Sequence, residues 1–250
     1  MKVAIVTGVS RRIGIGAAIA RTLAEAGTAV FTTYYRPYDA SMAWGSKDSE
    51  AESILAELRE MGVPADGAEA DLSNPAIPAR LIEQARQRFG HIDILVNNAT
   101  HDEESTLEEM DADNLDRHYA VNMRGPLLLC REFARVHDGR PGGRIINMTS
   151  GQSLTPMPGN LPYAATKGAI EAATMALSAA LAPKKITVNA VDPGATDTGW
   201  MSDELRQELI KMTPLGRIGK PMDAARLIRF LASDEAEWIT GQIIHSRGGL

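Results

Sequence analysis

The feature that most constrains this chain is a regular alternation of short strand-like runs with segments of helical periodicity. Between the runs, apolar residues recur three and four positions apart; Ile15, Ile19 and Leu23 share one helix face, for example, and Gly27 ends that helix. Strands that alternate with amphipathic helices predict an α/β fold, in which a doubly wound parallel sheet of about seven strands carries helices on both faces. The predicted strands are 3–6, 29–34, 65–70, 93–96, 144–148, 187–191 and 242–245.

The chain is long and apolar enough for one sizeable domain. It has 250 residues, of which 44% are hydrophobic, and it contains no internal repeat, low-complexity tract or linker. We therefore predict a single domain over residues 1–250. Its least regular stretch, residues 35–50, is rich in turn residues and predicts a long loop.

Charge and cysteine content argue against several classes of function. The net charge is −6, from 26 basic and 32 acidic residues, and no basic run is dense enough to predict binding to nucleic acid or to a membrane. Cys130 is the single cysteine, which fits a reducing cytoplasm, and its apolar neighbours favour a buried side chain over a nucleophile. The residues before Thr7 are too few for a signal peptide, and no apolar run has the length of a membrane span. We predict a cytoplasmic protein without a metal site.

Polar motifs come directly after four of the predicted strands. Residues 7–16 read TGVSRRIGIG, residues 97–100 NNAT, residues 149–150 TS and residues 192–198 DPGATDT. In an open parallel sheet, ligands bind beyond the carboxyl ends of the strands, where the order of the chain reverses. These segments therefore predict a ligand site at one edge of the sheet.

A tyrosine and a lysine stand four residues apart in the segment YAATK. A helix places Tyr163 and Lys167 on one face, where the ammonium favours the phenolate and lowers the pKa of the tyrosine, as a proton donor for carbonyl reduction requires. Ser150 lies thirteen residues before Tyr163, and Asn122 lies further upstream in YAVNMRGPLL. Each residue alone also fits a structural role, as a helix-start aromatic, a solvated charge, a turn residue or a polar break in a helix.

The types, order and spacing of these four residues resemble the Asn–Ser–Tyr–Lys tetrad of the short-chain dehydrogenase/reductase family. The segment after the first strand agrees with this. Gly8, Gly14 and Gly16 resemble the family's glycine fingerprint with two extra residues in the loop, although the glycines alone also fit a plain turn. The likeness extends over nearly the whole chain and implies a Rossmann fold.

The resemblance implies a role for each residue of the tetrad. Tyr163 would exchange a proton with the substrate oxygen, and Ser150 would hydrogen-bond that oxygen. Lys167 would lower the pKa of Tyr163 and bind the nicotinamide ribose, while Asn122 would hold a water that links Lys167 to solvent. The cofactor carries the hydride, so the implied reaction interconverts a small-molecule carbonyl and an alcohol.

The resemblance also implies a set of cofactor contacts. Asp71 would meet the adenine, with a cap for the following helix as the alternative. The chain departs from the family at Thr100, where glycine is usual, and at residues 245–247, where Val-Asp is more common. The implied cofactor-binding residues are Gly8, Ser10, Arg11, Arg12, Gly14, Ile15, Tyr34, Arg36, Asp71, Leu72, Asn98, Ala99, Tyr163, Lys167, Pro193, Gly194, Thr196 and Thr198.

The end of the second predicted strand favours NADP(H), with NAD(H) as the alternative. Tyr34 stands where the family's NAD-dependent members carry an aspartate, whose charge would repel a 2′-phosphate. Arg36 follows closely, and Arg11 and Arg12 lie in the lengthened glycine loop. Guanidinium groups pair well with phosphate, and solvated side chains without a ligand are the alternative for Arg11 and Arg12.

Three functions remain open from the sequence. The first, which we favour, is an NADP(H)-dependent carbonyl reductase or alcohol dehydrogenase similar to 3-oxoacyl-carrier-protein reductases. The second is an enoyl reductase, whose relatives also have longer glycine loops but usually space the tyrosine and lysine further apart. The third is a non-catalytic, dinucleotide-binding regulatory protein, although such proteins often lose one of these two residues.

Two further expectations concern assembly and substrate. Alanines along one side of the helical segment 164–181 predict a symmetric homodimer, doubled to a homotetramer, with the helix propensity of alanine as the alternative explanation. Trp200 and a short amphipathic helix after it predict an apolar lid, unless both are merely structural. Because no lysine or arginine lies between Ser150 and Tyr163, we expect a neutral carbonyl substrate beneath that lid.

Overall fold

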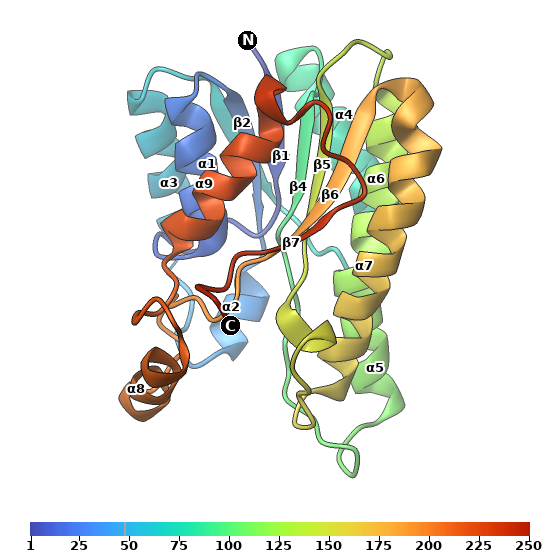
Figure 1. Cartoon of the computed structure of the whole chain (residues 1–250). Coiled ribbons are helices and arrows are strands. Elements are labelled where there is room, and N and C mark those ends of the chain that lie inside the picture. The colour runs from blue at the N-terminus through green and yellow to red at the C-terminus, as the bar shows by residue number, and fades with distance from the viewer. Residues whose placement is uncertain (48) are drawn as a thin grey trace.

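A seven-stranded parallel sheet forms the centre of the computed structural model, which describes residues 1–47 and 49–250 (Figure 1). The strand order is β3-β2-β1-β4-β5-β6-β7. Each strand lies within one residue of its predicted limits, so the doubly wound α/β prediction is confirmed. The strands are β1 (Val3–Val6), β2 (Ala29–Tyr34), β3 (Ala65–Glu69), β4 (Ile94–Asn97), β5 (Gly143–Met148), β6 (Ile186–Asp192) and β7 (Ile243–His245).

Helices cover both faces of the sheet, with α1, α3 and α9 on one side and α4, α6 and α7 on the other (Figure 1). Alternate residues of β1 divide between these layers: Val6 packs in the core beneath α1 and α9, and Ile5 in the core beneath α4 and α6. The helices are α1 (Ile15–Glu25), α2 (Arg36–Ser41), α3 (Glu50–Glu60), α4 (Ile77–Phe89), α5 (Ala112–Tyr119), α6 (Gly125–Val136), α7 (Leu161–Leu181), α8 (Asp203–Met212) and α9 (Pro221–Ala232).

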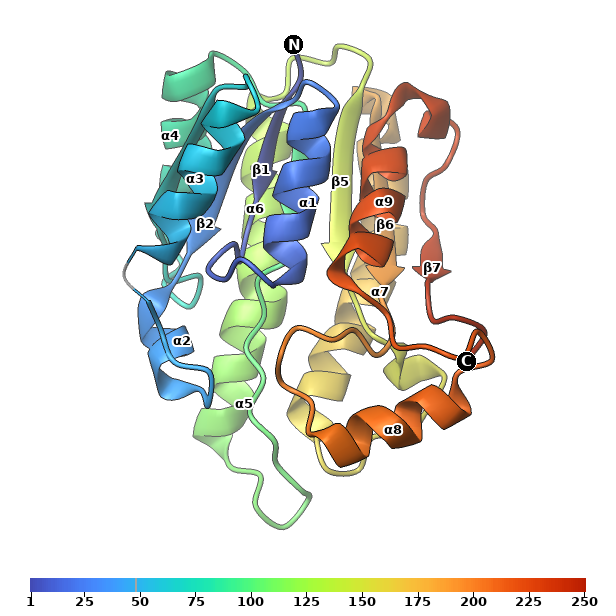
Figure 2. The ribbon, with the colours of Figure 1, turned by 90° about the vertical axis from the view of Figure 1, so that its left-hand side faces the viewer.

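The carboxyl ends of the strands all meet at the lower edge of the sheet in Figure 1. The chain order reverses between β1 and β4, which places the motif segments after β1, β4, β5 and β6 along this edge. Beyond it lie α2, α5 and α8, together with the C-terminal tail, as Figure 2 shows from a second direction. The sheet therefore positions the predicted site residues at one end of the molecule.

The prediction of a long loop over residues 35–50 was wrong in part, because α2 occupies its first half. A proline in the first turn costs a helix no hydrogen bond, and Pro37 stands there. The buried carboxylate of Asp39 then accepts a hydrogen bond from Trp44 Nε1 at 3.0 Å, which holds the following turn against the helix. Asp48, within the same stretch, lies outside the described residues.

Two further predictions concern Cys130 and membranes. The side chain of Cys130 is buried in the core, and burial raises the pKa of its thiol to about 12, so it behaves as the small hydrophobic residue that was predicted. In the described part of the chain, no helix combines the length and the apolar character that crossing a bilayer needs.

Candidate active site

The glycine loop after β1 is packed too closely for larger residues. Gly8 has a φ of +73°, and a Cβ on it would lie 2.7 Å from the Cα of Ala99. A Cβ on Gly16 would lie 2.4 Å from the carbonyl oxygen of Gly8. Gly14 is the N-cap of α1, so the loop leads directly into the helix N-terminus. This geometry goes beyond what a plain surface turn requires.

Hydrogen bonds join the glycine loop to the segment after β4. The side-chain amide of Asn98 donates to the carbonyl oxygens of Thr7 and Gly8, at 2.8 and 3.0 Å. The backbone amides of Asn98 and Ala99 both donate to Thr7 Oγ1, each at 3.0 Å. Thr100, where glycine was expected, is not among the described residues with positive φ, so the substitution causes no backbone strain there.

Tyr163 and Lys167 lie on one face of α7, as their spacing predicts. The Nζ of Lys167 is 5.3 Å from the centroid of the Tyr163 ring and donates to the carbonyl oxygen of Met148, at the end of β5, at 3.1 Å. Lys167 is only 4% exposed. The first turns of α7 therefore bring both side chains to the carboxyl edge of the sheet.

Burial shifts the pKa of both groups. It lowers the pKa of Lys167 to about 8, although the carboxylate of Asp102 opposes this shift. It also raises the pKa of Tyr163 above its ordinary value, and the charge of Asp102 raises it further. In this structure desolvation and nearby carboxylates favour the neutral phenol, and the lowering of the Tyr163 pKa by Lys167 stays a prediction.

Ser150 follows β5 and faces the same end of α7. Its Oγ is buried and makes no hydrogen bond of ordinary geometry with any described residue, yet it lies near enough to Tyr163 to lower the pKa of that phenol. Buried hydroxyls almost always have a partner in folded proteins. The Ser150 hydroxyl therefore marks a position where a ligand oxygen is expected.

Asn122 lies in a short π-helical segment, η1 (Ala120–Arg124), between α5 and α6. Its Oδ1 accepts from the amide of His101 at 2.7 Å and from Thr100 Oγ1 at 3.1 Å. Its Nδ2 donates to the carbonyl oxygen of His101 at 2.8 Å and to Thr166 Oγ1 at 3.2 Å. Interrupted helices of this kind often occur at functional sites. The side chain of Asn122 thus fastens the segment after β4 to the helix that carries Tyr163.

Asp102 is a residue of the site that the sequence analysis missed. Its backbone amide donates to the hydroxyl of Tyr38 at 3.2 Å, and its Oδ1 accepts from Asn160 Nδ2 at 2.5 Å. Its charge raises the pKa of both Tyr163 and Lys167. An acidic residue shortly after the NNAT motif was the available signal, but no spacing rule connects it to Tyr163.

Of the four residues predicted to decide between NADP(H) and NAD(H), three, Arg11, Tyr34 and Arg36, come together in a small pocket beyond β2. Arg11 lies with its guanidinium 4.2 Å from the centroid of the Trp44 ring, and Arg36 forms an ion pair with Glu69. The buried Asp39 brings a carboxylate to the same place. The pocket is lined by Ser10, Arg11, Tyr34, Arg36, Asp39, Gly45, Ser46, Lys47, Glu50 and Ala51.

Arg12 and Asp71 have structural partners. The guanidinium of Arg12 donates to Ser53 Oγ at 3.1 Å and to Glu57 at 2.9 Å, both on α3, and it does not line the small pocket. Oδ1 of Asp71 accepts from the amide of Ser73 at 2.9 Å in the turn before α4. The N-cap of α4 is Ala76, so Asp71 does not cap that helix as the alternative expected. The structure therefore ties both residues to the scaffold around the pocket.

The segment after β6 borders the site from the other side. The amide of Gly194 donates to Asp192 Oδ1 at 2.9 Å, and Thr196 Oγ1 donates to the carbonyl oxygen of Pro193 at 3.2 Å. Thr198 Oγ1 accepts from Arg11 at 3.4 Å, which connects this segment to the glycine loop.

The predicted lid does not close over the site in this structure. Trp200 is 51% exposed and donates from Nε1 to the carbonyl oxygen of Thr196 at 3.0 Å. None of the residues of α8 is buried, and the helix lies apart from both helix layers (Figure 2). Leu154 and Met157, in the segment after Ser150, are also exposed. The apolar side chains on both sides of the site are thus present but uncovered.

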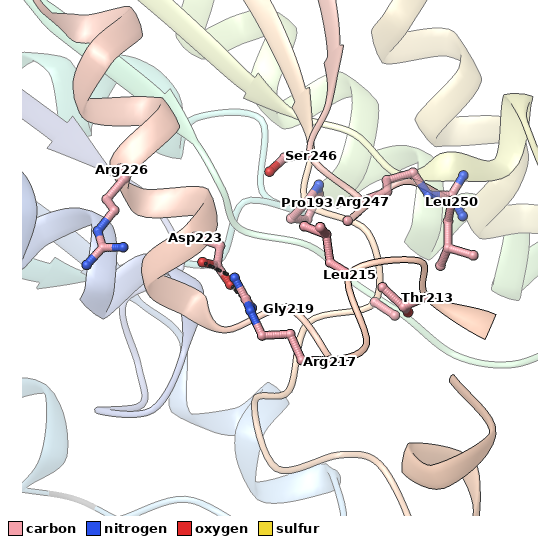
Figure 3. A pocket seen from close by; sticks show the side chains of 12 residues that line it. Pro193, Thr213, Leu215, Arg217, Gly219, Asp223, Arg226, Ser246, Arg247 and Leu250 are labelled. Atoms are coloured by element: carbon pink, nitrogen blue, oxygen red, sulfur yellow. Dashed lines mark hydrogen bonds and ion pairs between the residues drawn. The ribbon is translucent and has the colours of Figure 1, made fainter. Parts of the chain in front are cut away.

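A pocket of about 210 Å³ lies between the C-terminal tail, the segment before α9 and the start of α9 (Figure 3). Arg217 pairs with Asp223 on one side of it, at 2.7 Å, and the side chain of Arg247 extends from the tail toward the opposite side. Neither Ser150 nor Tyr163 lines this pocket, so its position does not match that of the tetrad.

Comparisons with known proteins agree with this geometry. A family model described as enoyl-(acyl carrier protein) reductase matches residues 8–250. The chain is 51% identical to the uncharacterized oxidoreductase YjdA of Bacillus subtilis, over 99% of this chain and 96% of that protein. It is 35% identical to a 3-oxoacyl-[acyl-carrier-protein] reductase, FabG, of Staphylococcus epidermidis, over 100% of this chain and 98% of that protein.

Solved structures give the same result. A short-chain dehydrogenase/reductase from Serratia marcescens superimposes with a TM-score of 0.88 at 36% identity, over 99% of this chain and 97% of that one. Likeness of this extent in both sequence and fold leaves one conclusion: the chain belongs to the short-chain dehydrogenase/reductase family of oxidoreductases.

Proposed function

We propose that the protein is an NADP(H)-preferring ketoreductase that interconverts a carbonyl and an alcohol, with Tyr163 as proton donor and acceptor. The observation that carries this proposal is the convergence of Tyr163, the buried Lys167 and the unpartnered Ser150 beside the closely packed glycine loop. The name of the staphylococcal relative, a 3-oxoacyl reductase, supports the same class of reaction.

Each side chain of the tetrad has a task in carbonyl reduction. The Tyr163 hydroxyl would donate its proton to the substrate oxygen and become a phenolate, whose charge burial disfavours. The ammonium of Lys167 would stabilise that phenolate, and Ser150 would donate a hydrogen bond to the same substrate oxygen. Asn122 would keep the segment after β4 in place against α7. The nicotinamide would supply the hydride.

The loop after β1 fits a dinucleotide. Because side chains are excluded at Gly8 and Gly16, a ligand's phosphates can approach the backbone closely, and the first amides of α1 point toward them. Pro193, Gly194, Thr196 and Thr198 would border the nicotinamide end.

The preference for NADP(H) rests on the small pocket beyond β2. Arg11, Arg36 and Lys47 line it and would pair with a 2′-phosphate, while Tyr34 contributes no charge that would repel one. Asp39 opposes this preference, since its buried carboxylate lies in the same pocket. Three cations line the pocket, one of them the Arg36 that pairs with Glu69, together with two acidic side chains, Asp39 and Glu50.

Enoyl reduction is the second candidate, favoured by the description of the matching family model. The four-residue spacing of Tyr163 and Lys167 argues for the ketoreductase instead, because enoyl reductases usually separate these residues further. Reduction of a 2-enoyl thioester, with ketones left unchanged, would establish the alternative. Cofactor binding without turnover of either class would point to a regulatory protein.

The alanine side of α7 supports a symmetric homodimer, doubled to a homotetramer. Ala165, Ala172 and Ala176 are exposed on one side of this helix, where small side chains let a second helix approach closely. Light scattering at micromolar concentration should report an oligomer. A monomer would contradict this part of the proposal.

A single hydroxyl tests the main proposal. A panel of ketones is assayed with NADPH for the wild type and for Tyr163→Phe, which keeps the ring and removes the proton donor. We expect turnover to fall by at least about 100-fold while thermal stability and NADPH affinity persist. Tyr119→Phe, a change at a well-exposed tyrosine of α5, is the matched control. Wild-type turnover in the Tyr163 variant would overturn the assignment.

A further inference from the structure

The C-terminal tail places an arginine beside the catalytic serine. The stem of Arg247 packs on Gly194, where an added Cβ would lie 3.0 Å from both its Cα and its Cγ. Its guanidinium rests on Gly151, the residue after Ser150, where an added Cβ would lie 2.3 Å from Nη1 and 2.5 Å from Cζ. Gly151 therefore leaves the space that the guanidinium occupies. Since consecutive Cα atoms are about 3.8 Å apart, the positive charge lies within about one residue of Ser150.

The hydrogen-bonding capacity of this guanidinium is largely unused. Nε and Nη1 of Arg247 are buried and have no hydrogen-bond partner among the described residues. The nearest carboxylate is Asp192 Oδ2, at 3.7 Å from Nε, which is too far for a hydrogen bond. That same oxygen lies 2.9 Å from His245 Nδ1, and Oδ1 accepts from Gly194. Asp192 thus holds the arginine electrostatically but leaves its donors unsatisfied, a costly arrangement in a buried place.

We propose that Arg247 binds the carboxylate of the substrate, and that the protein acts on short keto acids rather than on neutral ketones. This inference rests on the proposed carbonyl reduction and specifies the class of substrate that the same site would reduce. The planar fork of a guanidinium matches a carboxylate with two parallel hydrogen bonds. Because Gly151 directly follows Ser150, the proposal places the substrate carboxylate near its ketone, which favours acids whose carbonyl and carboxylate are separated by one or two carbons.

This assignment revises the expectation of a neutral substrate. That expectation came from the lack of lysine and arginine between Ser150 and Tyr163. The cation comes instead from the tail after β7, in the segment where the chain departs from its family. The tail reaches Gly151 and Gly194 because β7 runs parallel to β6, whose carboxyl end carries Asp192.

Acetoacetate and methyl acetoacetate test the proposal, because they differ in charge but not in the reacting ketone. The ratio of kcat/KM for the acid to kcat/KM for the ester is measured with NADPH. Arg247→Met removes the guanidinium and keeps a side chain of similar length, and we expect it to lower the ratio by about 10- to 100-fold. Arg226→Met is the matched control, since Arg226 is exposed and points away from the tail (Figure 3). An unchanged ratio in a folded Arg247→Met variant overturns the proposal.

A second variant tests the position of the charge. Gly151→Ala places a methyl group where the guanidinium lies, so it displaces Arg247 without altering any charge. We expect the ratio to fall as in Arg247→Met, even if turnover of both substrates declines because Ser150 is adjacent. A normal ratio in this variant would mean that the observed place of the guanidinium is irrelevant to substrate choice.

Binding measurements separate this proposal from the proposed function. Calorimetry with butanoate and butanamide needs no reduction and therefore reports on the anion site alone. We expect Arg247→Met to weaken butanoate binding at least tenfold and to leave butanamide unchanged. That result would support the anion site even if no ketone were reduced, in which case the ketoreductase assignment alone would fail. Equal butanoate affinity in the wild type and the variant would refute the anion site whatever the turnover.

Discussion

The two halves of the site differ in whether their buried polar groups have hydrogen-bond partners. At the ends of β1 and β4, the segments 7–8 and 98–99 are joined by four hydrogen bonds, and glycine is required for their close approach. At the ends of β5 and β6, Ser150 Oγ and two nitrogens of Arg247 are buried without hydrogen bonds among the described residues.

This contrast follows from what each half would bind. Every reaction of the enzyme would use the same dinucleotide, so its cradle can be complete before the ligand arrives. The groups that would recognise the substrate oxygen and its charge would contribute only if their hydrogen bonds were left for the substrate. In the packed half the polar groups bind one another, whereas Ser150 and Arg247 keep hydrogen-bonding capacity for a substrate.

The largest effect, a loss of turnover, is expected from a change at the ends of β5 and β6, where the buried polar groups lack partners. Ser150→Ala should lower ketone turnover by about 100- to 1,000-fold. The melting temperature should change little, because the Ser150 hydroxyl makes no hydrogen bond of ordinary geometry and acts only through its proximity to Tyr163. Ser153→Ala, a change at an exposed serine of the same segment, should alter neither quantity much. A fall in stability with normal turnover would show that Ser150 belongs to the scaffold and not to the chemistry of the site.

A change in the closely packed glycine loop after β1 should mainly lower the free energy of unfolding. Gly16→Ala places a methyl group 2.4 Å from the carbonyl oxygen of Gly8, so backbone must move. We expect the free energy of unfolding, from denaturant titration, to fall by about 1–3 kcal/mol, together with NADPH affinity. At Gly159, where no atom lies within 4 Å of an added Cβ, the same substitution should be neutral. Equal stability of the two variants would refute the close packing.

Because of Lys167, turnover and stability should change with pH in opposite directions. Its pKa of about 8 means that the ammonium is lost above that pH, so ketone reduction should fall, approaching tenfold per pH unit. In the unfolded chain, lysine keeps its proton to about pH 10.4, so unfolding takes up a proton in this window. The contribution of Lys167 to stability therefore rises with pH while turnover falls. Denaturant and rate profiles, compared with those of Lys167→Met, measure both slopes.

The smallest effect is expected at the adenosine end. Tyr34→Asp adds a negative charge beside Arg11 and Arg36, which should shift the ratio of NADPH to NADH affinity toward NADH by about tenfold. Asp39→Asn should shift it in the opposite direction, because a repelling carboxylate is removed. Fluorescence titration with both cofactors gives the ratios. Tighter binding of NADH by the wild type would contradict the NADP(H) preference.

The sequence predicts most of the fold because its strands are short, separate and bounded by turns. It missed α2, which contains a proline and lies among turn-forming residues. That helix is held by the hydrogen bond between Asp39 and Trp44, whose ring in turn contacts Arg11 of the glycine loop, and local patterns do not contain these contacts. Tyr163 and Lys167 were predictable because one helix turn connects them. Arg247 was not assigned a role, since only the order of strands across the sheet brings the tail after β7 to the end of β5.

The hydrogen bonds of Asn122 have a consequence for making chimeras with related enzymes. Its side chain joins the segment after β4 to Thr166 on α7, while Asn98 joins that segment to the glycine loop. Residues 7–8, 98–101, 122 and 166 therefore form one unit of exchange, although they are scattered along the gene. A crossover between residues 101 and 122 would keep every motif, but it would join Asn122 from one parent to the segment after β4 from the other. Productive crossovers should therefore lie outside this set of residues, for example in the segment that leads to α8.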